Sequence, residues 1–166
     1  MAWAKHASNK QIMIKKEIKA HIQIERIFLT KLEFETKNLR QGFDMKWRPK
    51  VGVEMTVSNT EIDDSEYEVS LEVKLDVALG SLDIFTVDVI QSGVFNVEDS
   101  PARQSILAAE CPTILFPYAR EAIDNVVIKA TLPAIALAPI NFREVVQRAM
   151  DENEPTVPRY TKPIVN

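Results

Sequence analysis

The chain has little cysteine, histidine or glycine, and each of these shortages excludes some classes of protein or of functional site. Among 166 residues there is one cysteine, Cys111, so no disulfide within the chain is expected and nothing indicates an oxidising compartment. The two histidines, His6 and His21, both lie near the N-terminus. No phosphate-binding glycine loop, dinucleotide fingerprint, zinc-protease motif, serine-hydrolase elbow or CxxC pair occurs. The sequence therefore does not favour an enzyme, and no metal or cofactor is expected.

Long hydrophobic runs and clustered positive charge are also scarce. The longest uncharged apolar stretch, residues 130–142, contains two prolines and falls short of the roughly 20 apolar residues that span a bilayer. Lysines at positions 10, 15, 16 and 19 interrupt the N-terminus, so no secretory signal is expected. With a net charge of −4, the chain is not expected to have the positively charged surface that binds nucleic acid or an anionic membrane. These absences predict a soluble domain without membrane insertion, cytoplasmic if its source is bacterial.

The front half of the chain is expected to be β-structure. From Tyr67 to Leu79 every second residue is apolar, which is typical of a strand with one buried face. A second alternating run covers residues 51–57, and a third, from 22 to 34, changes phase twice and so predicts a bulge or bend. Residues 82–97 carry apolar side chains on both faces, and Gly80–Ser81 predicts a tight hairpin. Four strands in meander order would form an antiparallel sheet.

The back half is expected to be helical. Apolar residues recur at three- and four-residue spacing between Leu115 and Val126, and the prolines at 112 and 117 predict that the regular helix starts near Ile114. Any helical turn before Cys111 should be separated from it by a kink. Asn141 and Glu144 have the spacing of a capping box for a last helix. The pattern gives an α+β domain over residues 22–152, with an N-terminal extension at 1–21 and a flexible tail at 153–166.

Two features leave a structural and a functional interpretation open. The uncharged segment 131–142, bracketed by Pro133 and Pro139, should be extended, and it either covers the core or forms one wall of an apolar groove. The carboxylates on one face of the strand at 66–76 form either an acidic docking surface or an ordinary solvated face: Glu66, Glu68, Glu72 and Asp76. Cys111 is interpreted as a small buried hydrophobic residue rather than a nucleophile.

Several separated motifs resemble the bacterial SecB family. CPTILFPYAREAI at 111–123 is similar to the family signature, and LPAIALAPINF at 132–142 is similar to its crossover loop and the start of its last helix. QIERIF at 23–28, YEVSLEV at 67–73 and SGVF at 92–95 follow in the family's order. The resemblance implies a four-stranded antiparallel sheet with helices packed on one face. It also implies a homotetramer, a dimer of dimers, that holds unfolded precursor proteins without ATP and passes them to the motor SecA.

The resemblance also implies roles for particular positions. The client-binding groove would be lined by Phe28, Trp47, Val51, Val53, Met55, Phe85, Ile135, Leu137, Phe142, Val145 and Val146. The face that contacts SecA would contain Lys31, Glu35, Thr86 and Asp88. In that face Lys31 stands where the family usually has an acid, and Thr86 where it usually has leucine. The helical stripe that would form the oligomer interface is Leu115, Tyr118, Ala122, Ile123 and Val126.

Two alternatives remain beside the export chaperone. The unusual SecA face and the added N-terminal segment suggest a SecB-like chaperone dedicated to the antitoxin of a toxin–antitoxin pair. The second alternative, from another class, is an adaptor without chaperone activity whose groove holds one folded partner.

Overall fold

The alternating run from Tyr67 to Leu79 forms a strand with one fully buried face. In the computed structural model, which describes residues 22–151, this strand is β3 (Glu66–Leu79), and the odd-numbered side chains of the run are at most 5% exposed. The even-numbered positions between them are partly or fully exposed. Period-two burial confirms the prediction and divides the sheet into an apolar and a polar face. The predicted extension 1–21 and tail 153–166 lie outside the described residues.

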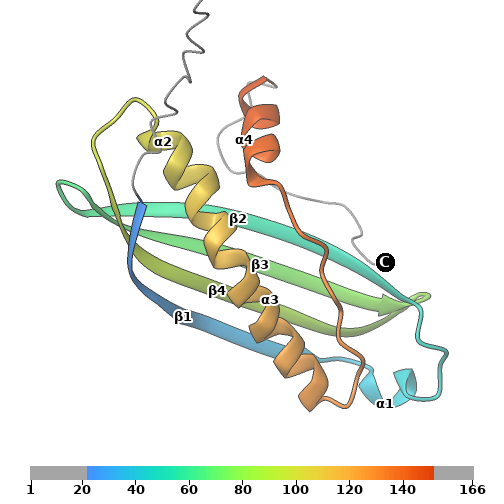
Figure 1. Ribbon diagram of the computed structural model, residues 1–166. Helices are drawn as coiled ribbons and strands as arrows, with labels where there is room; N and C mark the ends of the chain where they lie inside the picture. Colours follow the sequence, from blue (N-terminus) through green and yellow to red (C-terminus); the bar gives the residue numbers. More distant parts are fainter. Residues whose placement is uncertain (1–21, 152–166) are drawn as a thin grey trace, which may run out of the picture.

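The sheet has the order β1-β4-β3-β2 and is antiparallel throughout. Its other strands are β1 (Ile22–Thr36), β2 (Pro49–Asp63) and β4 (Leu82–Val97). The expected meander is therefore wrong at one step, because β1 pairs with β4 rather than with β2. The connection that contains α1 (Leu39–Gly42) crosses the end of the sheet, so β1 and β2 form opposite edges (Figure 1). This order gives the central positions to β3 and β4, the strands with the most buried side chains.

Both phase changes in β1 are bulges. The register of β1 against β4 shifts between Ile24 and Arg26, and again between Leu29 and Lys31. Each shift leaves one extra residue, Glu25 or Thr30, on β1. A side chain changes face with every residue, so each extra residue moves the following apolar positions back to the covered face. The prediction of an irregular strand is confirmed at both places.

The β3–β4 hairpin turns at the predicted dipeptide. Leu79 pairs with Leu82, and Gly80 has a φ of 63°, a conformation that glycine adopts without steric cost. Further along β4, three consecutive residues, Gln91, Ser92 and Gly93, are buried. Ile84 and Phe85 are also buried next to each other, whereas Ile90 is only partly buried, so the predicted burial of both faces holds for part of the strand.

The helical region begins earlier than predicted and has no break. Three segments follow one another directly: α2 (Arg103–Ser105), the π-helical η1 (Ile106–Glu110) and α3 (Cys111–Lys129). A wider π turn before Pro112 accommodates this residue, which has no N–H to donate, and the Thr113 hydroxyl donates to the Ala109 carbonyl at 2.7 Å. The start near Ile114 was therefore wrong, because helical structure already begins at Arg103. The irregularity expected before Cys111 takes the form of the π-helical segment η1.

The last helix, α4 (Phe142–Asp151), begins as its capping sequence predicted. The Asn141 side-chain amide donates to the Glu144 carboxylate at 2.9 Å, and the Glu144 N–H donates to Asn141 Oδ1 at 3.4 Å. In Figure 1, α2, α3 and α4 lie on one side of the sheet, with α3 running across the strands. The α+β fold class with helices on one face is confirmed, and the polar face of the sheet carries no helix within residues 22–151.

A matched pair of isoleucines tests this assignment of the core. Ile84 on β4 is fully buried, whereas Ile62 at the far end of β2 is 53% exposed. We expect Ile84→Ala to lower the free energy of unfolding by about 2–5 kcal/mol because it leaves a cavity. Ile62→Ala should change it by less than about 0.5 kcal/mol. Urea unfolding followed by circular dichroism measures both, and equal effects would contradict the assignment.

Candidate functional site

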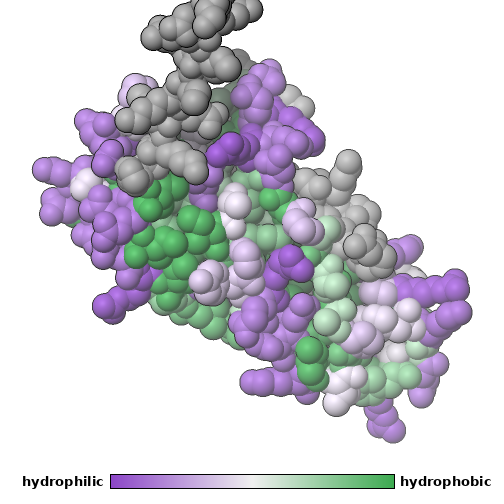
Figure 2. Space-filling model, in the orientation of Figure 1, coloured by the Kyte–Doolittle hydropathy of each residue, from purple (hydrophilic) through white to green (hydrophobic). Residues whose placement is uncertain are grey.

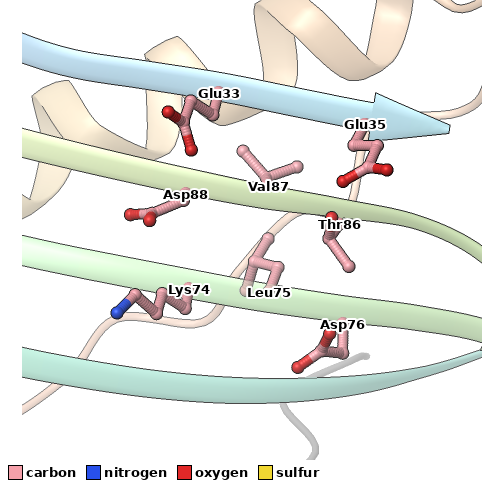
Figure 3. Close-up of a pocket in the computed structure, with 8 residues that line it drawn as sticks. All are labelled: Glu33, Glu35, Lys74, Leu75, Asp76, Thr86, Val87 and Asp88. Atoms are coloured by element: carbon pink, nitrogen blue, oxygen red, sulfur yellow. The ribbon is translucent and has the colours of Figure 1, made fainter.

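The open face of the sheet collects all four residues predicted to contact SecA. Lys31 and Glu35 come from β1, and Thr86 and Asp88 from β4. Glu35 pairs directly with Thr86, and the neighbouring Glu33 pairs with Asp88, so these side chains project from the same face. Three of the four, Glu35, Thr86 and Asp88, line a shallow hollow of about 250 Å³ together with five neighbouring residues (Figure 3). The lining residues are Glu33, Glu35, Lys74, Leu75, Asp76, Thr86, Val87 and Asp88.

Ion pairs within this face neutralise part of the negative charge of its carboxylates. Lys31 Nζ lies 2.9 Å from Asp88 Oδ2 and 3.1 Å from Glu33 Oε2. The hydrogen bond to Asp88, followed by that to Glu33, raises the pKa of Lys31, so the ammonium stays charged at neutral pH. Lys74 pairs with Glu72 at 3.0 Å, and this hydrogen bond raises the pKa of Lys74 in the same way. Lys31 therefore neutralises part of the negative charge that Asp88 contributes to this face.

Phe28, predicted to line the groove, lies on this open face instead. It pairs with Ser92, whose hydroxyl is within 2.6 Å of the Thr30 hydroxyl and 2.8 Å of the Ser70 hydroxyl. Ser92 is fully buried although its face of the sheet has no helix over it. The bulge at Glu25 sets this direction, and the structure does not bring Phe28 together with the other groove positions.

Eight of the other predicted groove residues are buried on the helical side, each at most 5% exposed: Val51, Val53, Met55, Phe85, Ile135, Leu137, Phe142 and Val146. Phe142 packs edge-on against Phe116, with ring centroids 5.9 Å apart. In this conformation these side chains belong to the core of the chain, and charged substitutions at Val53 or Met55 would disrupt it. Trp47 and Val145 remain partly exposed.

A pocket of about 480 Å³ joins Trp47 to the crossover segment. Its walls come from the end of the β1–β2 connection and from the segment between α3 and α4: Trp47, Arg48, Pro49, Pro133, Ala134, Ile135 and Ala136. Prolines at 49 and 133 hold both walls in extended geometry. The structure thus brings two predicted groove residues, Trp47 and Ile135, to one concave site. The crossover beside it has neither helix nor strand, but Ala136 has a φ of 52°, so the expected extended course is interrupted there.

Two exposed apolar residues near Trp47 were not predicted. Phe43 is 53% exposed and Met45 is 43% exposed, and both precede Trp47 in the same connection. The alternation of Phe43, Met45 and Trp47 in a segment without strand structure was the signal that could have found them. Exposed apolar side chains add to the surface available to a hydrophobic ligand.

The predicted interface stripe on α3 faces mainly the protein's own sheet. Leu115 and Ile123 are fully buried and Ala122 is 9% exposed, so these three belong to the core of the single chain. Tyr118, at 49% exposed, and the partly exposed Val126 keep accessible surface. Both the buried and the exposed side of α3 carry apolar residues, so their spacing in the sequence could not show which of them face the sheet.

Other apolar residues do remain uncovered along β1 and α3. Figure 2 shows hydrophobic residues gathered on the side of the molecule where β1 runs past α3. The exposed large side chains of these two elements are Ile24, Leu29, Leu32, Tyr118 and Ile128. Because β1 is also an edge strand, this side has both apolar surface and unpaired backbone groups within the described chain.

Residues 22–151 contain no group of three or more His, Cys, Asp or Glu side chains arranged to hold a metal ion. None of the helices described in that range is long and apolar enough to cross a membrane.

The fold and sequence match known proteins of one kind. The SecB-like chaperone Rv1957 of Mycobacterium tuberculosis, solved with a ChAD peptide from the antitoxin HigA1, has a similar fold with a TM-score of 0.60 at 18% identity. The match covers 72% of this chain and 90% of that one. The fold is thus that of SecB-like chaperones. A family model described as preprotein translocase subunit SecB matches residues 15–153, beginning within the predicted extension.

Sequence relatives agree with the family model. The protein-export protein SecB of Marinobacter nauticus is 38% identical over 133 residues, which cover 79% of this chain and 81% of that protein. SecB of Legionella pneumophila is 36% identical over 137 residues, covering 81% and 85% of the two chains. The chain belongs to the SecB family of protein-export chaperones.

Cys111 allows a test of how closed the helical side is. The side chain is fully buried, and burial, with a smaller contribution from Glu110, raises the pKa of the thiol to about 12. Since only the thiolate reacts, Cys111 should be inert to a disulfide reagent at pH 8 and react once urea unfolds the chain. Because the chain has one cysteine, the absorbance of the chromophore that the reagent releases measures directly the fraction of molecules in which Cys111 has reacted. Rapid labelling of the native protein would contradict the buried assignment.

Proposed function

We propose that this protein is a non-enzymatic, ATP-independent holding chaperone of the cytoplasm that binds unfolded precursor proteins and delivers them to SecA. The observation that carries the proposal is the apolar pocket at Trp47, which joins two predicted groove residues from distant parts of the chain. Family membership supports the same activity.

The pocket suits extended apolar segments of an unfolded chain. Pro49 and Pro133 rigidify its rims, while Phe43 and Met45, in the connection that leads to Trp47, add exposed apolar surface. Burying one large apolar side chain contributes on the order of 1.5–3 kcal/mol before entropic costs, so one site alone binds weakly. Several such sites on one assembly, engaged by one long client, raise the affinity through effective concentration. Folded proteins do not offer such segments, and this selects for non-native clients.

Assembly into a homotetramer, a dimer of dimers, would supply those several sites. The exposed apolar side chains along β1 and α3 and the free edge of β1 support self-association on that side. Tyr118 and Val126 are the members of the predicted stripe that can take part, together with Ile128.

SecA would dock on the opposite, open face of the sheet. Glu35 and Thr86 line its hollow together with Asp88, and the carboxylates of β3 at positions 66, 68, 72 and 76 extend the acidic surface. The ion pair between Lys31 and Asp88 opposes a basic partner at the centre of this surface. This pair also favours a second candidate function, a SecB-like chaperone dedicated to one antitoxin, in which SecA plays no part.

The client pocket can be tested by removing its indole. Trp47→Ala should weaken binding to a panel of unrelated unfolded proteins by about tenfold, because the contact area of one large side chain is lost. Ile62→Ala, an exposed apolar residue at the other end of β2, is the control and should bind as the parent does. Light scattering should give the same tetramer mass for all three proteins.

The panel also separates the candidate functions. Binding to many unrelated unfolded proteins supports a general holding chaperone. Binding to a single unfolded sequence would favour the antitoxin-dedicated chaperone, and binding only to a folded partner would favour the adaptor.

The open face can be tested by charge substitution. Lys31→Asp combined with Thr86→Leu should tighten SecA binding by about threefold to tenfold at low salt, because it frees Asp88 and restores an apolar contact. Glu35→Lys combined with Asp88→Lys should abolish binding. The difference should shrink at physiological ionic strength, where the Debye length is about 8 Å.

Lys129→Asp is the matched control for charge, since Lys129 is an exposed lysine at the end of α3 on the helical side. It should leave SecA binding unchanged in the same titrations. Equal affinity of all variants would mean that the open face is not the docking surface, and would favour the antitoxin-dedicated chaperone.

A further inference from the structure

The crossover between α3 and α4 holds two residues in a strained backbone conformation. Thr131 has a φ of 61° and Ala136 a φ of 52°, and these are the non-glycine residues with positive φ among those described. The left-handed region is unfavourable for L-residues, and most of all for a β-branched residue such as threonine. Such strain persists where the surroundings impose it, and it recurs at ligand clamps and switches.

The helix end imposes the first strained residue. The Thr131 N–H donates to the Ile128 carbonyl at 2.9 Å, and the Leu132 N–H donates to the Val127 carbonyl at 3.3 Å. These two bonds form the left-handed helix ending in which glycine is the usual residue. Leu132 is thereby directed into the core, where it is 7% exposed.

A single carboxylate holds the second strained residue. Asp124, on α3, accepts hydrogen bonds at Oδ1 from the Ile135 N–H at 3.1 Å and, more weakly, from the Ala136 N–H at 3.5 Å. Successive N–H groups of an extended strand point in opposite directions, so their convergence on one oxygen marks a turn of the chain. Among the described residues, the two hydrogen bonds from this stretch to α3 therefore both end on Asp124.

The stretch held in this way is the wall of the Trp47 pocket. Pro133, Ala134, Ile135 and Ala136 line the pocket, while the side chains of Ile135 and Leu137 are turned into the core at 3% and 2% exposed. The wall in its present position therefore conceals two residues that the sequence assigned to the client groove.

We propose that Asp124 is a latch that holds residues 133–137 closed against the strain at Ala136, and that an unfolded client binds by lifting this wall. Lifting would expose Ile135 and Leu137 and enlarge the apolar surface around Trp47. Backbone strain at Ala136 offsets part of the free energy needed to open the wall, and contacts of the client with the exposed apolar side chains supply the rest. This inference rests on the proposed holding function and makes Asp124 a positioning residue for it.

Removing the latch gives the first test, in the full-length protein. In Asp124→Ala the Ile135 amide should exchange with solvent deuterium about tenfold faster than in the parent, because its hydrogen bond is lost and the wall opens more often. The same variant should bind reduced, carboxymethylated lactalbumin, a permanently unfolded probe, about threefold to tenfold more tightly, because less of the binding energy is used to open the wall. Glu121→Ala, one turn earlier on α3, removes a carboxylate that bonds Asn125 and not the crossover, and should change neither.

Relieving the strain gives a second test with the opposite sign. Asparagine adopts positive φ more readily than alanine, and position 136 is exposed, so Ala136→Asn should stabilise the closed wall. We expect slower exchange of the Ile135 amide and several-fold weaker lactalbumin binding. This variant keeps the backbone groups that bond Asp124, so it tests the latch even if Asp124→Ala folds poorly. Because Ala136 also lines the pocket, the exchange rate of the Ile135 amide is the deciding measurement for this variant.

The outcomes separate the latch from the proposed function. Faster exchange in Asp124→Ala without tighter binding, or tighter binding in Ala136→Asn, would overturn the latch. Unchanged exchange in both variants would overturn it as well. A parent protein that binds no unfolded probe would contradict the holding function itself, whereas the exchange measurement would still report whether Asp124 closes the wall.

Discussion

The burial of one face of β3 and β4 under α3 is the constraint from which the other features follow. A strand with alternating apolar and polar residues has one apolar face. The helices therefore pack on that face of the sheet, and the opposite, polar face remains exposed to solvent. The Lys31–Asp88 ion pair, the hydroxyl contacts of Ser92 and the shallow hollow near Glu35 all lie on that remaining side. The pocket at Trp47 lies on the covered side, where the crossover meets the β1–β2 connection. One protein thus presents two chemically different surfaces without a second domain.

This separation of surfaces fits the proposed function. A client bound at Trp47 and a basic partner on the open face would not compete for the same side chains. The apolar side chains of the groove assignment are at the same time the core of the fold, as Ile135 and Leu137 show. If core residues are to bind a ligand, the segment that covers them must open at a low free-energy cost. The cost must be low because the free energy of unfolding of the whole protein is itself only a small difference between large terms.

Most of the strand structure could be predicted because period-two burial depends on local geometry alone. The run from Tyr67 to Leu79 and the two phase changes of β1 were confirmed residue by residue. Strand order was not predictable in this way, since nothing local states that the chain after Thr36 crosses to the far edge. The π turn before Cys111 was missed because proline signals the loss of one hydrogen bond but not how the preceding turn adapts.

The site was harder to predict because core and groove use the same residue types. Apolar spacing alone could not distinguish buried Ile123 from exposed Tyr118 on α3, nor Val53 in the core from Phe43 at the surface. Phe28 changed face through a bulge whose position the pattern indicated but whose effect on this side chain depends on register. The left-handed residues Thr131 and Ala136 had no signal at all, since neither is a residue that favours that conformation.

The two bulges of β1 also limit what can add to its free edge. A regular edge strand offers a long, evenly spaced row of donors and acceptors, and any extended polypeptide can extend the sheet from it. In β1 the extra residues Glu25 and Thr30 interrupt that row, so an incoming strand meets only short regular stretches between and beyond them. For a protein proposed to handle unfolded chains, this spacing works against uncontrolled growth of mixed sheets. A strand with the same interruptions, such as β1 of a second copy, is the one best matched to it.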